Sequence, residues 1–150
     1  MSRPFSIVAL LLLGFNAAAA SDATLLESIA MVESGMDRKA IGKAGERGMY
    51  QMGKQAWTDA NARLEAQGHY HFQWSKWRDI TAQDMTAAAH LAILRDRFKA
   101  VGMGDPTPEQ IALAWNLGFS GAKEAKWKPN GYAMRVANLF HLSQRQGAAK

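Results

Sequence analysis

The sequence contains no cysteine, which excludes a disulfide framework and a cysteine-based lipid anchor. Metal-binding patterns are equally scarce. His69 and His71 flank a tyrosine, but two histidines without further ligands do not make a zinc site, and we read them as loop residues. We therefore expect neither a metal nor a cofactor, and any chemistry must come from ordinary side chains.

Long apolar runs are also missing. The run Ile7 to Leu13 is too short to cross a bilayer, follows the positive charge of Arg3, and precedes small residues at 17–20. This pattern is typical of a secretory signal peptide, and an N-terminal membrane anchor is the less favoured alternative. We expect residues 1–20 to be the signal and residues 21–150 to form one domain. The mature protein would then be periplasmic or secreted, with no stable membrane anchor.

Acidic residues are fewer than basic ones, with 13 Asp and Glu against 18 Lys and Arg, for a net charge of +5. A mild positive charge suits a cell-wall polymer, anionic lipid or nucleic acid alike, so charge alone does not identify a partner. The helices lack the lysine-rich polar face of a membrane-active protein. We expect no nucleic-acid partner, and we interpret the basic stretch Lys123 to Lys128 as solvated surface.

Helical periodicity and capping signals predict an all-α single domain. One region departs from this pattern: glycines punctuate residues 42–53, which we expect to form a loop or, at most, a small hairpin. The predicted helices are Thr24 to Glu33 with a capping box at Thr24, Gln55 to Gln67, one from Thr81 to before Gly102, Thr107 to Gly118, and Tyr132 to Ser143.

Glu33 is the most informative acid in the chain. Leu26, Ile29, Ala30 and Glu33 recur at helical spacing, so they share the apolar face of one helix. A carboxyl on a buried face loses hydration in its charged form, which raises its pKa. A raised pKa keeps the proton in place for use as a general acid. The alternative is a helix-end glutamate that points to solvent.

The glycine-punctuated segment Gly45 to Gln51 follows this acid. Glycine lets a ligand approach the backbone closely. Met49, Tyr50 and Gln51 add soft packing, an aromatic face and an amide. A sugar needs a flat apolar surface and amide partners for its polar groups, so the pattern favours a sugar site over a plain surface turn.

Three motifs in order give the chain a family resemblance. Glu33-Ser34, then Gly45-Glu46-Arg47-Gly48-Met49-Tyr50-Gln51, then Ala114-Trp115-Asn116-Leu117-Gly118 resemble the signature of the soluble lytic transglycosylases. Tyr132 occupies the place of that family's tyrosine, and the resemblance runs from about Leu25 to Phe140. It implies a lysozyme-like α-helical fold and cleavage of peptidoglycan glycan strands.

The resemblance implies a single catalytic acid, Glu33, which breaks the bond between N-acetylmuramic acid and N-acetylglucosamine and closes a 1,6-anhydro ring. Ser34 would hold this acid in place. The substrate-binding residues would be Ser34, Met49, Gln51, Trp115, Asn116 and Tyr132. Small relatives open the wall for a secretion, conjugation or phage apparatus, so such a machine is a further implied partner.

The sequence departs from the family pattern at several positions, of which Glu46 is the most consequential. If Glu46 points into the cleft, two carboxylates would support hydrolysis, as in goose-type lysozymes. We expect it to point outward as a solvated charge, beside Arg47. Trp115 and Leu117 replace a tyrosine and a small residue, which leaves open a non-catalytic wall-binding protein of the same fold.

Overall fold

The computed structural model describes residues 21–149, so the predicted signal peptide lies outside the described residues. The first helix covers residues 21–34, and the later elements are α2 Lys54–Ala66, the short 3-10 helix η1 Trp74–Lys76, α3 Ile80–Ala100, α4 Pro108–Glu124 and α5 Gly131–Ala148. Residues 21–149 contain no β-strand, and the expected hairpin is reduced to the isolated bridges Ile41–Arg47 and Arg47–Met52. The predicted all-α, lysozyme-like fold is confirmed.

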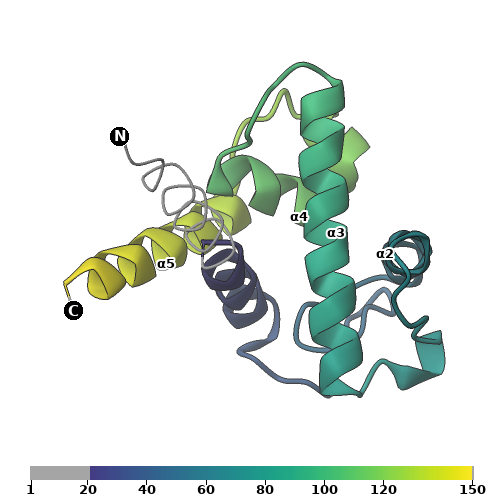
Figure 1. The fold of residues 1–150 in the computed structure, drawn as a ribbon. Coiled ribbons are helices and arrows are strands. Elements are labelled where there is room, and N and C mark those ends of the chain that lie inside the picture. Colours follow the sequence, from purple (N-terminus) through teal and green to yellow (C-terminus); the bar gives the residue numbers. More distant parts are fainter. Residues whose placement is uncertain (1–20, 150) are drawn as a thin grey trace, which may run out of the picture.

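Helix α3 is the longest described element and stands at the centre of the molecule (Figure 1). Helix α2 packs along it, and α4 packs against both α3 and α5. The first helix and α5 lie together on the other side of α3 from α2 in this view (Figure 1). The glycine-rich segment at residues 35–53 connects the first helix to α2, and so passes from one side of the molecule to the other.

The hydrophobic core joins every long element. The first helix contributes Leu26, Ile29 and Ala30, all buried, which confirms the face predicted from their spacing. The same cluster contains Met49 and Met52 from the glycine-rich segment. Its large, fully buried members from the later helices are Leu91, Leu94, Phe98, Ile111, Leu113 and Val136. Because the segment after Glu33 is anchored by two buried methionines, it is held in place as part of the core.

The predicted helix starts agree with the structure to different degrees. Thr107 accepts from the N–H of Gln110, whose side chain returns the bond, so this capping box is confirmed. Thr24 is not an N-cap, because residues 21–24 are already helical. Asp22 in that extra turn pairs with Arg95 Nη2 at 2.5 Å, which ties the turn to α3 and favours the longer helix.

The predicted end of the fourth helix at Gly118 is only half right. Gly118 has φ 73° and ψ 161°, which breaks the helical path, but α4 resumes beyond it and reaches Glu124. Phe119, in the resumed segment, contacts the rings of Phe98 and Trp127 edge to face, so aromatic packing supports this extra turn. Helix α5 likewise extends past the predicted Ser143 to Ala148.

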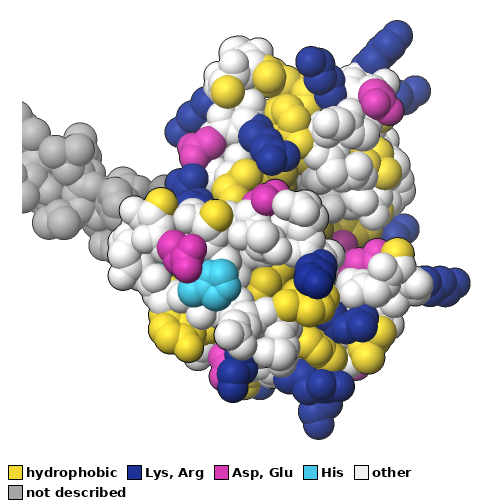
Figure 2. Space-filling model, turned by 90° about the vertical axis from the view of Figure 1, so that its right-hand side faces the viewer, with side chains coloured by type: hydrophobic (Ala, Val, Ile, Leu, Met, Phe, Trp, Pro, Cys, Tyr) yellow, Lys and Arg dark blue, Asp and Glu magenta, His cyan; other side chains and the backbone are white. Residues whose placement is uncertain are grey.

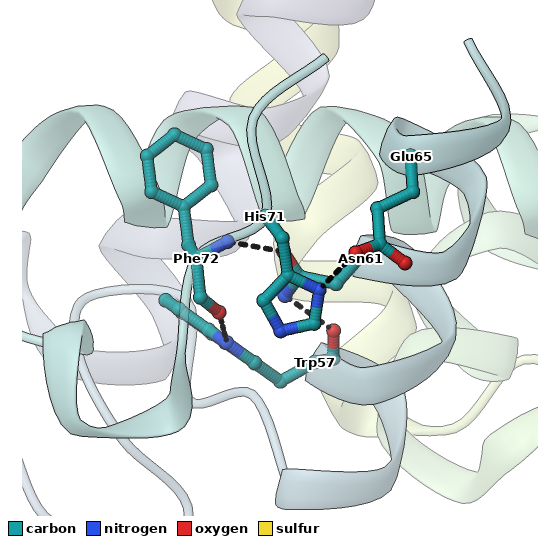
Figure 3. Close-up of polar contacts among 5 residues, drawn as sticks. All are labelled: Trp57, Asn61, Glu65, His71 and Phe72. Carbon is teal, nitrogen blue, oxygen red and sulfur yellow. Dashed lines mark hydrogen bonds and ion pairs between the residues drawn. The ribbon is translucent and has the colours of Figure 1, made fainter. Parts of the chain in front are cut away.

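The aromatic segment between α2 and α3 is fastened to α2 by two hydrogen bonds, and a third bond within α2 orients the Asn61 amide (Figure 3). Trp57 Nε1 donates to the carbonyl of Phe72, whose N–H donates to Asn61 Oδ1, and Asn61 Nδ2 donates to the Trp57 carbonyl. His71 pairs with Glu65 at 2.9 Å at the surface. His71 is therefore a loop residue, as the sequence indicated, and its contact with Glu65 holds the loop against α2.

Lys and Arg side chains are spread over the face shown in Figure 2, with Asp and Glu side chains and small hydrophobic patches between them. Among residues 21–149, no helix combines the length and the apolar character that crossing a bilayer requires.

Candidate active site

The first helix delivers Glu33 to the point where the helix ends. Gly35 follows in the left-handed region at φ 64°, where glycine is favoured, and its N–H bonds to the carbonyl of Met31. Glu33 lies one turn beyond the buried pair Ile29 and Ala30 and is itself half-buried. The side chain thus leaves the core at the edge of a surface hollow.

The glycine-rich segment is clamped by Gln83, a buried polar side chain on α3. Its Oε1 accepts from the N–H of Met49 at 2.8 Å, and its Nε2 donates to the carbonyl of Arg38 at 3.0 Å. A Cβ at Gly48, where φ is 74°, would collide with this amide. Glycine is therefore required at position 48 both by backbone angle and by the close approach of Gln83.

Ser34 connects the acid-bearing helix to the same segment. Its hydroxyl lies 2.8 Å from the carbonyl of Met49 and 3.3 Å from that of Ala30, and it accepts from the N–H of Asp37 at 3.0 Å. This hydroxyl fixes the position of the helix end against the loop. The geometry is what a residue that holds Glu33 in place would need.

A cleft of about 460 Å³ opens beside Glu33. Three of the other predicted site residues, Gln51, Trp115 and Asn116, lie in its wall together with the acid. The remaining lining residues come from the glycine-rich segment and are Gly42, Lys43, Ala44, Glu46 and Gly53. Residues more than 60 positions apart in the sequence therefore meet in one hollow.

Tyr132 reaches Glu33 from α5. Its hydroxyl donates a hydrogen bond of 2.7 Å to Glu33 Oε1. The pKa of Glu33 is raised above its ordinary value of 4.5, first because burial penalises the charged carboxylate. The Tyr132 hydrogen bond acts in the opposite direction, and the negative charge of Glu46 adds to the rise. Burial also raises the pKa of Tyr132, which therefore stays a neutral donor.

Glu46 lies in the cleft wall, which corrects the expectation that it points outward. Its Oε2 accepts from the N–H of Ala44 at 3.1 Å, so the carboxylate closes its own tight turn. A Cβ at Gly42 would collide with side-chain oxygens of both Glu46 and Gln51, so these two side chains converge over that glycine. Gly42 is the sequence signal for this placement, because only a residue without a side chain leaves room for the Glu46 carboxylate there.

Arg47 explains why its neighbour turns inward. Its Nη1 donates to the carbonyls of Gly45 and Glu46 at 2.8 and 3.1 Å, and its guanidinium lies 5.6 Å from the ring centre of Trp77. Arg78 stacks on the same indole at 4.1 Å. Arg47 is thus bound to the loop and to an aromatic ring, and it does not draw Glu46 toward solvent.

Trp115 is held rigidly in the cleft wall. Its Nε1 donates to the carbonyl of Tyr50 at 3.1 Å, and the imidazole of His90 meets its ring edge-on at 4.8 Å. Burial lowers the pKa of His90 to about 4, so the imidazole is neutral at pH 7. The Tyr50 hydroxyl in turn donates to Asp84 at 2.9 Å, which links the loop to α3.

Met49 differs from the other predicted site residues. Its side chain is 4% exposed and belongs to the hydrophobic core, whereas its backbone N–H and carbonyl bind Gln83 and Ser34. Two supporting residues escaped sequence reasoning: Gln83, which binds the loop, and Asn130, whose Nδ2 donates to Asn116 Oδ1 at 3.1 Å. Gln83 is a polar residue on the buried face of a helix, and that mismatch was a usable signal.

A second hollow of about 460 Å³ is lined by the first helix, α3, the start of α4 and α5. Of its charged lining residues, Asp22 binds Arg95 and His141 lies 3.6 Å from Glu109, whereas Asp105 has no ion-pair partner within residues 21–149. Residues 21–149 contain no cluster of three His, Asp or Glu side chains able to hold a metal ion. The cleft beside Glu33 contains a carboxyl group whose pKa is raised, and is therefore the better candidate for chemistry.

Comparison with known families gives one match, to the transglycosylase SLT domain, over residues 15–137. A search of curated proteins and a search of solved structures found no match. The family match covers most of the chain and contains Glu33, the glycine-rich segment, Asn116 and Tyr132. The chain belongs to the transglycosylase SLT domain family.

Proposed function

We propose that this protein is an exported lytic transglycosylase that cuts peptidoglycan between N-acetylmuramic acid and N-acetylglucosamine. Family membership supports a lytic transglycosylase-type, peptidoglycan-acting function at the family level. The observation that carries the finer proposal is Glu33, a half-buried acid of raised pKa at the wall of an open cleft, bonded to Tyr132 at 2.7 Å.

In the first step, Glu33 donates its proton to the oxygen that links the two sugars. The bond between that oxygen and C1 of the muramic sugar breaks, and N-acetylglucosamine leaves with the proton. Burial favours this step, because it keeps Glu33 protonated at a higher pH than a solvated glutamate. The N-acetyl oxygen of the substrate stabilises the positive charge at C1 in place of a second carboxylate.

In the second step, the C6 hydroxyl of the muramic sugar attacks C1. The now ionised Glu33 takes the hydroxyl proton, a C6 oxygen–C1 bond forms, and the 1,6-anhydro ring closes without water. The Tyr132 hydroxyl bonds to Glu33 Oε1 and stabilises the carboxylate between the two steps. Glu33 finishes protonated and ready for the next cut.

The cleft walls suit a sugar chain. Trp115 offers an aromatic surface, and Gln51 and Asn116 offer amides for hydroxyl and N-acetyl groups. Ser34 and Met49 lie behind the wall and hold the loop against the acid-bearing helix. The signal-like residues 1–20 and the positive charge of the chain, of which only Arg3 lies in those residues, fit a protein that meets an anionic wall polymer after export.

Mass spectrometry of purified sacculi digested by the protein tests this reaction. We expect muropeptides that end in 1,6-anhydro-N-acetylmuramic acid, and no such product from the Glu33→Gln variant. Products that carry only reducing-end muramic acid would reject ring closure.

A second candidate function is hydrolysis, and the placement of Glu46 in the same cleft as Glu33 favours it. A second carboxylate could activate a water for attack on C1. Digestion in ¹⁸O-labelled water separates the two reactions, because hydrolysis places the label on the reducing end and ring closure does not. Hydrolysis also requires that Glu46→Gln lose turnover.

A further inference from the structure

Asn130 begins helix α5 and makes two hydrogen bonds with one amide. Its Oδ1 accepts from the backbone N–H of Ala133 at 2.9 Å and so caps the helix. A backbone N–H can only donate, so the oxygen of the Asn130 amide must face Ala133. The orientation of this amide is therefore fixed by the helix that it starts.

The other end of the amide points to the cleft residue Asn116. Asn130 Nδ2 donates to Asn116 Oδ1 at 3.1 Å. Since Nδ2 can only donate, the Asn116 carbonyl oxygen must turn toward Asn130. Within residues 21–149, the Asn116 Nδ2 group makes no bond to protein, and Asn116 lies in the wall of the cleft beside Glu33.

We propose that Asn130 is a positioning residue that orients the Asn116 amide, so that the cleft presents N–H donors here and selects an acceptor oxygen of the glycan. A carbonyl oxygen of an N-acetyl group or a hydroxyl oxygen meets this requirement, and a group that can only donate does not. This inference rests on the proposed function for the identity of the ligand. The orientation itself follows from the Ala133, Asn130 and Asn116 contacts alone.

The same residue also starts the helix that carries Tyr132 two positions later. A substitution that loses the cap would therefore disturb Tyr132 and its bond to Glu33, and would not isolate Asn116. Serine and aspartate are good N-cap residues, so Asn130→Ser and Asn130→Asp retain the cap. Neither can donate through Nδ2, and only aspartate offers an acceptor to Asn116.

The two variants have different expected effects on the Michaelis constant for sacculi, each measured at its own pH optimum. Asn130→Ser releases the Asn116 amide, and we expect KM to rise about 3–10-fold with kcat nearly unchanged. Asn130→Asp makes the Asn116 NH₂ turn toward the new carboxylate. The Asn116 Oδ1 atom then faces the cleft, so KM should rise further than in Asn130→Ser. Thermal unfolding should stay near that of the wild type in both.

A matched control is Asn138→Ser, the same substitution at an exposed position two turns along α5. It should leave KM, kcat and thermal unfolding unchanged. An unchanged KM in Asn130→Ser would overturn the proposal. A rise in KM together with a large fall in kcat and a lower unfolding temperature would also overturn it, because these changes together would indicate that the start of α5 is damaged.

Side-chain amide NMR separates this inference from the proposed function, since it needs no catalysis. The Asn130 amide proton bonded to Asn116 should shift when Asn116 is changed to alanine, and tri-N-acetylchitotriose should shift the Asn116 NH₂ signals of the wild type. If sacculi remain uncut while both shifts occur, the proposed function fails and the positioning role stands. If the Asn130 side-chain signals do not shift in Asn116→Ala, the positioning role is overturned, whether or not the protein cuts sacculi.

Discussion

The hydroxyl of Tyr132 and the carboxyl of Glu33 lie 2.7 Å apart although 99 residues separate them in the chain. The hydroxyl donates, so it stabilises the charged carboxylate and lowers the pKa of Glu33, while burial raises it. Burial is the larger effect, and the pKa of Glu33 remains above 4.5. The hydrogen bond from Tyr132 thus limits the rise in the pKa of Glu33 and fixes the position of its Oε1 atom.

Replacing Tyr132 with phenylalanine should raise the pKa of Glu33 further, because the carboxylate loses a donor. The general acid is active when protonated, so the high-pH limb of the activity profile should move to higher pH. At the same time kcat should fall by about tenfold, since the acid loses a hydrogen bond to its charged form. Profiles of kcat against pH check both effects. Tyr70→Phe, at a position that is 72% exposed, should change neither.

Replacing Glu46 with glutamine should have the opposite effect on the acid. Removing a nearby negative charge lowers the pKa of Glu33, so the high-pH limb should move to lower pH. Under ring closure the variant keeps making 1,6-anhydro products, and mass spectrometry of its digests checks this. Glu124→Gln, at an exposed position on α4, is the matched control and should leave the limb in place. If the high-pH limb of the activity profile does not move in Glu46→Gln, the charge of Glu46 does not influence the pKa of Glu33.

Arg47 should influence catalysis through the position of Glu46. Arg47→Met removes the two hydrogen bonds to the Gly45 and Glu46 carbonyls, so the high-pH limb should shift in the same direction as in Glu46→Gln, but less. Arg78→Met removes the other guanidinium from Trp77 and touches no loop carbonyl. The pH profile of this control should match that of the wild type. Equal shifts in both variants would show that only packing on Trp77 matters.

His90 should make the fold sensitive to mild acid. Its pKa is lowered to about 4 by burial and by Arg97, with Asp59 acting in the opposite direction, while an unfolded chain takes up the proton near pH 6.5. Because the unfolded state then binds more protons, stability is fully present above pH 6.5 and falls as the pH drops toward 4. The loss is on the order of 3 kcal/mol.

His90→Phe should abolish this part of the acid-dependent loss, since phenylalanine does not titrate and preserves the ring contact with Trp115. Urea unfolding at pH 7, 5.5 and 4.5 measures the difference in unfolding free energy. The exposed His69 provides the control, and His69→Gln should decline in acid as the wild type does. Parallel declines in wild type and His90→Phe would show that His90 is not the group responsible.

Local signals in the sequence predicted much of the fold. Thr107 with Gln110, and Glu33 at helical spacing from Leu26, Ile29 and Ala30, depend only on residues a few positions apart. Such patterns are predictable because the geometry of one helix turn alone determines which of these residues meet. The end of the first helix at Gly35 follows in the same way from the backbone angle that glycine permits.

Contacts between distant segments were harder to foresee. The direction of Glu46 is set by Arg47 and Trp77, and the orientation of Asn116 by Asn130, and none of these pairs has a periodic signature. In the sequence, Arg47 beside Glu46 favours solvent exposure, because the contact of Arg47 with Trp77, 30 positions away, has no local signal. Likewise Thr24 has a good capping sequence, but the pairing of Asp22 with α3 favours a longer helix.

The proposed reaction requires above all that Glu33 retain its proton. A ¹³C NMR titration of the Glu33 side-chain carboxyl carbon, assigned by its loss in Glu33→Gln, measures this directly in the free protein. We predict a midpoint above 4.5. A midpoint at or below 4.5 would mean that burial does not outweigh the Tyr132 hydrogen bond, and would contradict the role of Glu33 as an acid that stays protonated in the cleft.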